Sequence, residues 1–150
     1  MAEALRFHYD VDGDNFTSAG AASVEVKRKL RQLGFDAETI RRVSIAMYEG
    51  EINMVVHARG GSADVYVDKN SITIILADSG PGIPDIDLAM QEGYSTAPDN
   101  IRALGFGAGM GLPNMKRYTD EMKIDTVLGK GTTVTMKVYF NTGKSTTSAE

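Results

Sequence analysis

Residues 71–83 read SITIILADSGPGI, an apolar strand that ends in a carboxylate and a glycine turn. The run up to Ala77 predicts a buried strand, and Asp78 stands at its end. A carboxylate in this position can accept a hydrogen bond from an exocyclic amine such as that of adenine, and glycine lets a flat ring approach the backbone. The alternative interpretation is an ordinary loop. The candidate ligand-binding residues here are Asp78, Gly80, Gly82 and Ile83.

A second glycine-rich segment, GFGAGMG at 105–111, precedes a predicted helix. Alternating glycines leave backbone N–H groups free to face phosphates, and the start of the helix adds its dipole. The spacing fits neither the Rossmann nor the P-loop pattern. The alternative is a plain flexible loop, which also suits a lid. The candidates are Gly105, Gly107, Gly109, Met110, Gly111 and Leu112, with Arg102 and Lys116 as flanking cations that either meet phosphates or are solvated.

A third segment, GKGTT at 129–133, lies in a predicted turn between two strand-like runs. The hydroxyl of Thr132 or Thr133 can hold adenine directly or through a water molecule. The alternative reason for these threonines is β-propensity.

Upstream, Glu49 and Asn53 lie four residues apart in a predicted helix and therefore about 40° apart on one face. The helix is apolar nearly all round, so the pair must face a cleft or find partners. An Asn oxygen suits Mg²⁺, and a neighbouring Glu can act as a general base. The alternative is that Glu49 pairs with Arg42 or Arg59.

Two neighbours of this pair receive no role in the site. Glu51 points about 160° away from Glu49 around the helix. Gly50 costs about 1 kcal/mol relative to alanine inside a helix, and close packing is the suggested reason for it.

Composition narrows the function classes. A chain of 150 residues, 42% hydrophobic and 24% charged, suits one globular domain, which we place at 1–140 with a disordered polar tail at 141–150. A net charge of -4 without a basic face argues against general nucleic-acid binding. The absence of cysteine excludes disulfides and thiolate metal sites. We see no apolar run of about 18 residues and no signal-peptide pattern, so we expect no membrane partner and a cytoplasmic location.

The predicted order is a strand, two helices, two strands, a loop-rich segment, a helix and two strands. Tight hairpins imply antiparallel pairing, and helices grouped between strands imply an α+β fold. We therefore predict a two-layer α/β sandwich with a mixed, mostly antiparallel sheet and helices on one face. The elements are a strand at 5–11; a helix from a cap at Thr17 or Ser18 to Leu33; a helix at 37–58 capped by Asp36 and closed by Gly60–Gly61; strands at 63–67 and 71–77; a short helix at 85–92; a loop at 93–104; a helix at 112–120; and strands at 123–127 and 132–140.

Taken together, the four motifs resemble the gyrase, Hsp90, histidine-kinase and MutL ATPase superfamily, the Bergerat fold. The resemblance runs from about Ile40 to Tyr139. It implies that ATP and Mg²⁺ are the cofactors. It also implies that Glu49 is the general base, Asn53 the Mg²⁺ ligand, Asp78 the reader of adenine, and 105–111 the ATP lid.

Within the superfamily, the chain resembles the bacterial anti-sigma-factor and switch-protein serine kinases. The phrases at 78–85, 93–96 and 129–134 are most similar to the stressosome-type switch kinases, although the segment between Thr96 and Gly105 is long for them. The resemblance implies phosphorylation of a Ser or Thr on a STAS-domain antagonist protein. A sigma factor or a downstream regulator is a further candidate partner, and the oligomeric state stays open.

Three functions therefore compete. The first is an ATP-dependent protein serine/threonine kinase. The second is a nucleotide-gated, anti-sigma-type binding module with little or no kinase activity. The third is a detached histidine-kinase catalytic domain, which is weakened because His8, on the first predicted strand, is poorly placed as a phosphate acceptor.

Overall fold

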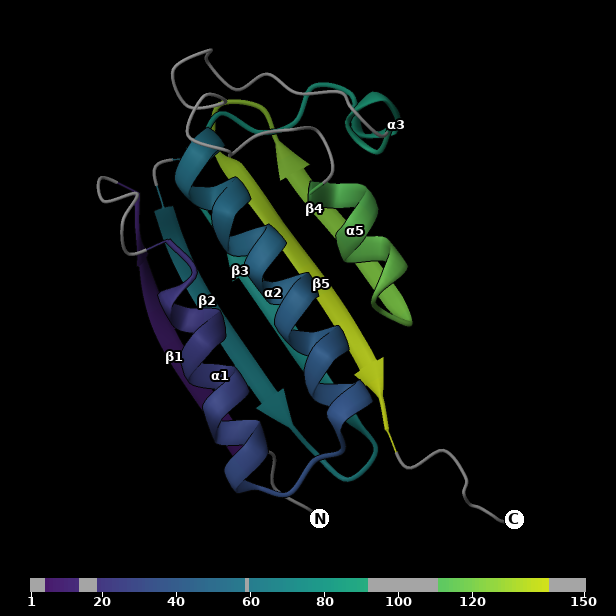
Figure 1. The fold of residues 1–150 in the computed structure, drawn as a ribbon. Helices are drawn as coiled ribbons and strands as arrows, with labels where there is room; N and C mark the ends of the chain where they lie inside the picture. Colours follow the sequence, from purple (N-terminus) through teal and green to yellow (C-terminus); the bar gives the residue numbers. More distant parts are fainter. Residues whose placement is uncertain (1–4, 14–18, 59, 92–110, 141–150) are drawn as a thin grey trace.

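Five strands form one sheet, and α1, α2 and α5 lie together on one of its faces (Figure 1). The structure is a computed structural model that describes residues 5–13, 19–58, 60–91 and 111–140. The strand order is β1-β2-β3-β5-β4, and every neighbouring pair is antiparallel. The predicted α+β fold with helices on one face is confirmed, but the described strands form no parallel pair, so the sheet is not mixed as predicted. The elements are β1 (Leu5–Asp12), α1 (Ala21–Gln32), α2 (Ala37–Ala58), β2 (Gly60–Val67), β3 (Ser71–Ala77), α3 (Ile86–Ala89), α5 (Gly111–Arg117), β4 (Glu121–Val127) and β5 (Gly131–Tyr139).

The core lies between the sheet and the helices. Strand side chains alternate between the two faces, so every second residue of the central strands meets the helix layer. Burial of these apolar side chains is the main driving force that holds the layers together. They are Ala63, Val65 and Val67 on β2, Ile72, Ile74 and Leu76 on β3, and Val134, Met136 and Val138 on β5. From the helices, α2 contributes Val43, Met47 and Met54, and α1 contributes Val26 and Leu30.

Gly50 stands where α2 meets both β3 and α5. A Cβ atom added there would overlap Cδ1 of Leu76 and lie 3.0 Å from Cε of Met115. Both of these side chains are buried, so neither can move aside without disturbing the core. Close packing is therefore the reason for glycine at this helix position, and the suggestion made from the sequence is confirmed.

The start of α1 differs from the prediction. The helix begins at Ala21 after the N-cap residue Gly20. Glycine has no side chain, so the N-cap residue makes no side-chain hydrogen bond to the helix. The predicted cap residues Thr17 and Ser18 lie outside the described residues.

The acceptor for the first amides of α1 is the carboxylate of Glu51 on α2. Its Oε2 accepts the N–H groups of Gly20 at 2.9 Å and Ala22 at 3.1 Å, and its Oε1 accepts that of Ser23 at 3.0 Å. Amides in the first turn of a helix need an outside acceptor, and a carboxylate makes a strong one. Glu51 is only 2% exposed. Its carboxylate therefore links α1 to α2.

At α2, the predicted start is confirmed but the role predicted for the glycines after it is wrong. Asp36 caps α2 as predicted, because its carboxylate accepts the Thr39 N–H at 3.2 Å. Gly60 and Gly61 were predicted to close α2. They instead begin β2, where Gly60 pairs with Asp12 on β1. A Cβ atom at Gly60, whose φ is 101°, would overlap the Val11 carbonyl oxygen, so glycine permits this close approach.

The two short helices, α3 and α5, both end earlier than predicted. α3 spans only Ile86–Ala89, with Asp85 as its cap, and α5 ends at Arg117 rather than at 120. The predicted loop at 93–104 and tail at 141–150 lie outside the described residues, and the domain bounds stay a prediction. Among the helices that the structure describes, none is both long and apolar enough to cross a membrane.

The two histidines have opposite environments, which gives a pH prediction. His8 lies on the sheet face opposite the helices, with Nδ1 2.7 Å from Asp64 and Nε2 3.3 Å from Asp10. The hydrogen bond with Asp64 raises the pKa of His8 above 6.5. Burial in the last turn of α2 lowers the pKa of His57 below 6.5. In an NMR titration we expect the His8 ring signals to move at higher pH than those of His57.

The two shifts act on stability in opposite directions. Stability from the His8–Asp64 pair is present below pH ~6.5 and is lost as the pH rises through the raised pKa of His8. Stability from neutral His57 is present above pH ~6.5 and is lost as the pH falls toward its lowered pKa. Asp64→Asn is the control, since it should bring only the His8 titration back toward 6.5. Equal midpoints for the two wild-type histidines would contradict this assignment.

Candidate functional site

Asp78 is anchored by the main chain at the end of β3. Its Oδ1 accepts the N–H of Gly80 at 2.9 Å and the N–H of Thr132 at 3.1 Å. Its own N–H donates to the Thr132 carbonyl oxygen at 2.9 Å. Within the part of the chain that the structure describes, no hydrogen bond reaches Oδ2. The carboxylate is thus held in one orientation, with one oxygen to which no described residue donates.

Thr132 joins the first and third glycine segments. It is 8% exposed, and its hydroxyl lies 2.9 Å from that of Thr126 on β4. The Thr126 hydroxyl in turn accepts the N–H of Ile83 at 2.8 Å. Gly129 donates its N–H to the Pro81 carbonyl oxygen at 2.8 Å. The turn at 78–83 and the turn at 127–131 therefore form one hydrogen-bonded edge of the sheet.

Thr133 lies on the other side of β5. Alternation along the strand directs it away from the helix layer, where it pairs with Ala77 and with Asp125. Of the two threonines named from the sequence, Thr132 is the one whose N–H donates to the Asp78 carboxylate.

The turn at 78–83 packs on the C-terminal end of α2. A Cβ atom at Gly80 would lie 2.5 Å from Cβ of Ala58 and 2.8 Å from its Cα atom, so only glycine fits here. Gly82 has a φ of 85°, in the left-handed region that favours glycine. Both glycines thus serve the close approach of this turn to neighbouring backbone.

Glu49 and Asn53 face α5. Asn114 on α5 donates from Nδ2 to Oε2 of Glu49 at 3.3 Å. A Cβ atom at Gly111 would lie 2.8 Å from Oδ1 of Asn53, which leaves no room for a side chain there. Asn53 also places its Nδ2 3.9 Å from Sδ of Met115, a weak contact. Both predicted site residues on α2 are partly buried at the junction with α5.

Arg42 and Arg59 were the alternative partners predicted for Glu49. Arg42 bonds instead to Asp120 at 3.0 Å, so the pairing of Glu49 with Arg42 is not found. Arg59 lies outside the described residues.

The remaining candidates are divided between α5 and the undescribed segment. Gly111 and Leu112 are the first residues of α5, and Leu112, 9% exposed, belongs to the core. Lys116 is exposed on the same helix. Gly105, Gly107, Gly109, Met110 and Arg102 lie outside the described residues.

Sequence reasoning missed two residues, Asn114 and Glu51. Asn114 follows Gly111 by three residues and so lies on the same face of α5, which is a signal that the helical period offers. Glu51 received no role in the predicted site, and no local pattern indicated its contact with α1.

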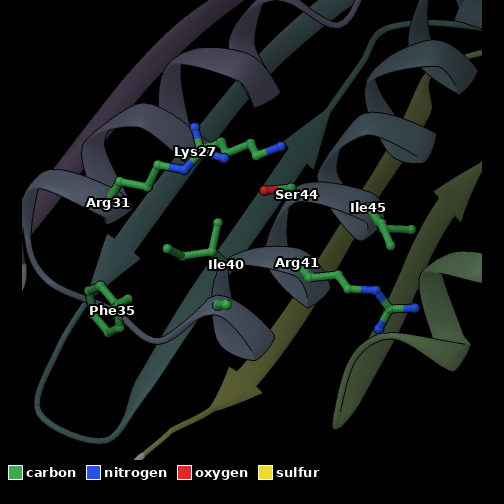
Figure 2. A pocket seen from close by; sticks show the side chains of 8 residues that line it. Lys27, Arg31, Phe35, Ile40, Arg41, Ser44 and Ile45 are labelled. Atoms are coloured by element: carbon green, nitrogen blue, oxygen red, sulfur yellow. The ribbon is translucent and has the colours of Figure 1, made fainter.

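A surface groove of about 480 Å³ lies elsewhere, over the N-terminal half of α2 and beside α1 (Figure 2). Its lining includes the cations Lys27, Arg31 and Arg41 and the apolar residues Phe35, Ile40 and Ile45. Figure 2 shows Lys27 extending from α1 toward Ser44 on α2. None of its lining residues belongs to the Asp78 edge or to the Glu49–Asn53 pair. We therefore do not place the ligand site in this groove.

Comparison with known proteins gives a family match over most of the chain. A family model described as a histidine kinase-like ATPase domain matches residues 15–138. The Serine/threonine-protein kinase RsbT of Bacillus subtilis is 34% identical over 108 residues, which cover 69% of this chain and 75% of that protein. An Anti-sigma F factor of Thermoanaerobacter sp. is 32% identical over 118 residues, which cover 75% of this chain and 79% of that protein.

Two solved structures share the fold. The RsbU and RsbW domains of a Mycobacterium tuberculosis protein align with a TM-score of 0.61 and 16% identity, over 89% of this chain and 32% of that one. The mycobacterial sensor histidine kinase MprB aligns with a TM-score of 0.52 and 18% identity, over 90% of this chain and 97% of that one. At these identities, the likeness concerns the fold alone.

Proposed function

Because the chain belongs to the histidine kinase-like ATPase domain family, we propose that it is an ATP-dependent protein serine/threonine kinase of a partner-switching pathway. The family resemblance seen in the four motifs is confirmed, and the expected enzyme class is that of the RsbT relative. The observation that carries the proposal is the Asp78 carboxylate, whose Oδ1 is fixed by two backbone amides while Oδ2 is left to a ligand.

The order of groups along α2 supports ATP as the substrate. The Asp78 turn packs at Ala58, the last residue of α2. Asn53 lies five residues earlier, about 7.5 Å along the helix axis, and Glu49 lies about 13.5 Å from Ala58. In this proposal, Asp78 and Thr132 bind adenine, and Asn53 lies nearer the phosphates. Glu49 then stands farthest from the adenine, where the acceptor hydroxyl would enter.

The donor set suits a magnesium ion that is bound together with ATP. Among the described residues, no group of three His, Cys, Asp or Glu side chains could hold a metal. A single side-chain oxygen at Asn53 fits Mg²⁺, which commonly takes one or two protein ligands and completes its shell with phosphates and water. When bound, Mg²⁺ neutralises negative charge on the phosphate oxygens.

Glu49 has the role of general base in this proposal. Its carboxylate takes the proton of a Ser or Thr hydroxyl on the partner protein. The hydroxyl oxygen then forms a bond to the γ-phosphorus, the bond from that phosphorus to the β–γ bridging oxygen breaks, and ADP leaves with the electron pair.

The proposed protein substrate is a STAS-domain antagonist. We carry over from the family resemblance that phosphorylation of this antagonist changes its choice of partner, and that a sigma factor or downstream regulator is the other partner. A cytoplasmic location fits this role and is part of the same proposal.

A second candidate function is an anti-sigma-type binding module with little kinase activity. The relatives named Anti-sigma F factor favour it, at 32% identity for the Thermoanaerobacter protein. The two candidates differ in their need for Glu49. Full regulatory function in a Glu49→Gln protein would favour the binding module, and complete loss of regulation would favour the kinase.

The test is phosphate transfer to a STAS-domain protein encoded beside this chain. We expect the partner to gain the mass of one phosphate when it is mixed with this protein, ATP and Mg²⁺. The modification should be an acid-stable Ser or Thr ester, and the matching Ser or Thr→Ala partner is the control. An acid-labile phosphohistidine would indicate the histidine-kinase alternative, and no transfer to any such partner would overturn the kinase proposal.

A further inference from the structure

The carboxylate of Glu49 is oriented from α5. Glu49 and Asn114 are 65 residues apart in the sequence, yet Nδ2 of Asn114 donates to Oε2 of Glu49 at 3.3 Å. No other hydrogen bond reaches the Glu49 carboxylate from the residues that the structure describes. We infer that Asn114 is the positioning residue for Glu49, which rests on the proposed function of Glu49 as the base.

The amide of Asn114 is itself fixed in direction. Nη1 of Arg117 donates to Oδ1 of Asn114 at 3.1 Å. A guanidinium can only donate and an ionised carboxylate can only accept, so Oδ1 must face Arg117 and Nδ2 must face Glu49. The two contacts therefore agree on one orientation of an amide that geometry alone would leave ambiguous.

The helix that carries Asn114 is seated tightly on α2. Met115, the next residue, is fully buried and lies against the Gly50 position of α2. Gly111, at the start of α5, lies against the side chain of Asn53. The same short helix thus touches both the proposed base and the proposed magnesium ligand. It also follows directly on the glycine segment expected to cover the phosphates. The seating of α5 therefore sets the orientation of Glu49.

A reacting group must be held in a narrow range of positions, and a misplacement of about 1 Å can cost about 100-fold in rate. Without Asn114, the Glu49 carboxylate keeps its chemistry but loses the donor that orients it. Loss of Asn114 should therefore lower kcat and leave the binding of ATP unchanged, since Asn114 is not among the proposed adenine or magnesium ligands.

The test compares Asn114→Ala with Asn114→Asp. Aspartate has the shape of asparagine and still accepts from Arg117, but it cannot donate to Glu49 and brings a second carboxylate beside it. A merely structural role predicts that the aspartate variant is the milder one. A positioning role predicts that kcat falls about 10- to 100-fold in both variants, at least as much with aspartate, while KM for ATP stays within about twofold. Asn70→Asp, the same change at an exposed hairpin position, is the matched control and should behave as wild type.

A second measurement detects the contact without any turnover. The side-chain NH₂ signals of Asn114, identified by their loss in Asn114→Asp, should shift in a ¹H–¹⁵N spectrum when Glu49 is changed to Ala, which removes the acceptor. Wild-type kcat in both Asn114 variants, or unshifted signals in Glu49→Ala, would overturn the inference while the kinase proposal stands. A folded wild-type protein that transfers no phosphate would overturn the proposed function and, with it, the role of Asn114 in the reaction.

Discussion

Glu49→Gln protein is expected to bind ATP with wild-type affinity and to transfer phosphate about 10²- to 10⁴-fold more slowly. Glutamine has nearly the same shape and keeps an oxygen that can accept the Asn114 hydrogen bond, so the fold and the binding site should survive. It cannot take up a proton at neutral pH, so the attacking hydroxyl would have no base. The measurement is kcat for phosphate transfer, together with ATP affinity by calorimetry.

Glu38→Gln is the matched control for this substitution. Glu38 lies on the same helix, is exposed, and is 3.5 Å from Arg41 in a weak surface pair. It should leave both kcat and affinity unchanged, since such pairs contribute little. A Glu49→Gln protein that retains a third or more of the wild-type kcat would remove Glu49 from the role of base.

Glu51→Ala is expected to lower the free energy of unfolding by about 3 kcal/mol or more. Three N–H groups at the start of α1 lose their acceptor, and each unsatisfied buried donor costs about 1 to 3 kcal/mol. That is a large share of the 5 to 15 kcal/mol typical of a domain. Urea unfolding measures the loss. Amide hydrogen exchange should show faster exchange at Ala22 and Ser23, which would locate the damage at α1.

The control for this prediction is Glu25→Ala on α1. The Glu25 side chain is 45% exposed and pairs with Arg28 at 2.7 Å, so its loss should cost less than about 1 kcal/mol. Equal stability of the two variants would show that Glu51 is not the cap of α1.

Glu49 and Glu51 show which features of α1 and α2 could be predicted from the sequence. The 100° turn per residue predicts that they lie on opposite sides of α2, and the structure places them at different neighbours, α5 and α1. The bounds of α2 were also predictable, because Asp36 is a local cap. The start of α1 was not predictable, because its cap comes from a residue about thirty positions along the chain. Local rules describe neighbours in sequence, and this acceptor is a tertiary contact.

The glycines show the same limit. A propensity scale assigns Gly50 only a cost, since its benefit comes from Leu76 and Met115 on other elements. Gly60 and Gly61 suggested a helix end, but they serve the pairing of β2 with β1.

In the candidate site, Asp78, Gly80 and Thr132 could each be named from a sequence motif, and the structure brings them together because β3 and β5 are adjacent strands. Strand alternation could have separated Thr132 from Thr133. The helical period places Asn114 on the same face as Gly111, but its contact with Glu49 could not be predicted, since it forms only once α5 is packed on α2.

The most direct test of the central claim is a calorimetric titration of the folded protein with ATP and Mg²⁺, beside Asp78→Asn. Asparagine keeps an oxygen that accepts from the Gly80 and Thr132 amides. In place of Oδ2, however, it has an amide NH₂ group, which cannot accept a hydrogen bond from the amine of adenine. The loss of a hydrogen bond to a charged acceptor is worth about 1.5 to 3 kcal/mol, so we predict roughly 10- to 150-fold weaker binding. Asp125→Asn, on the opposite face of the sheet, should bind as wild type does. Equal affinity of wild type and Asp78→Asn, or no binding of ATP by the folded wild type, would contradict the assignment of this site.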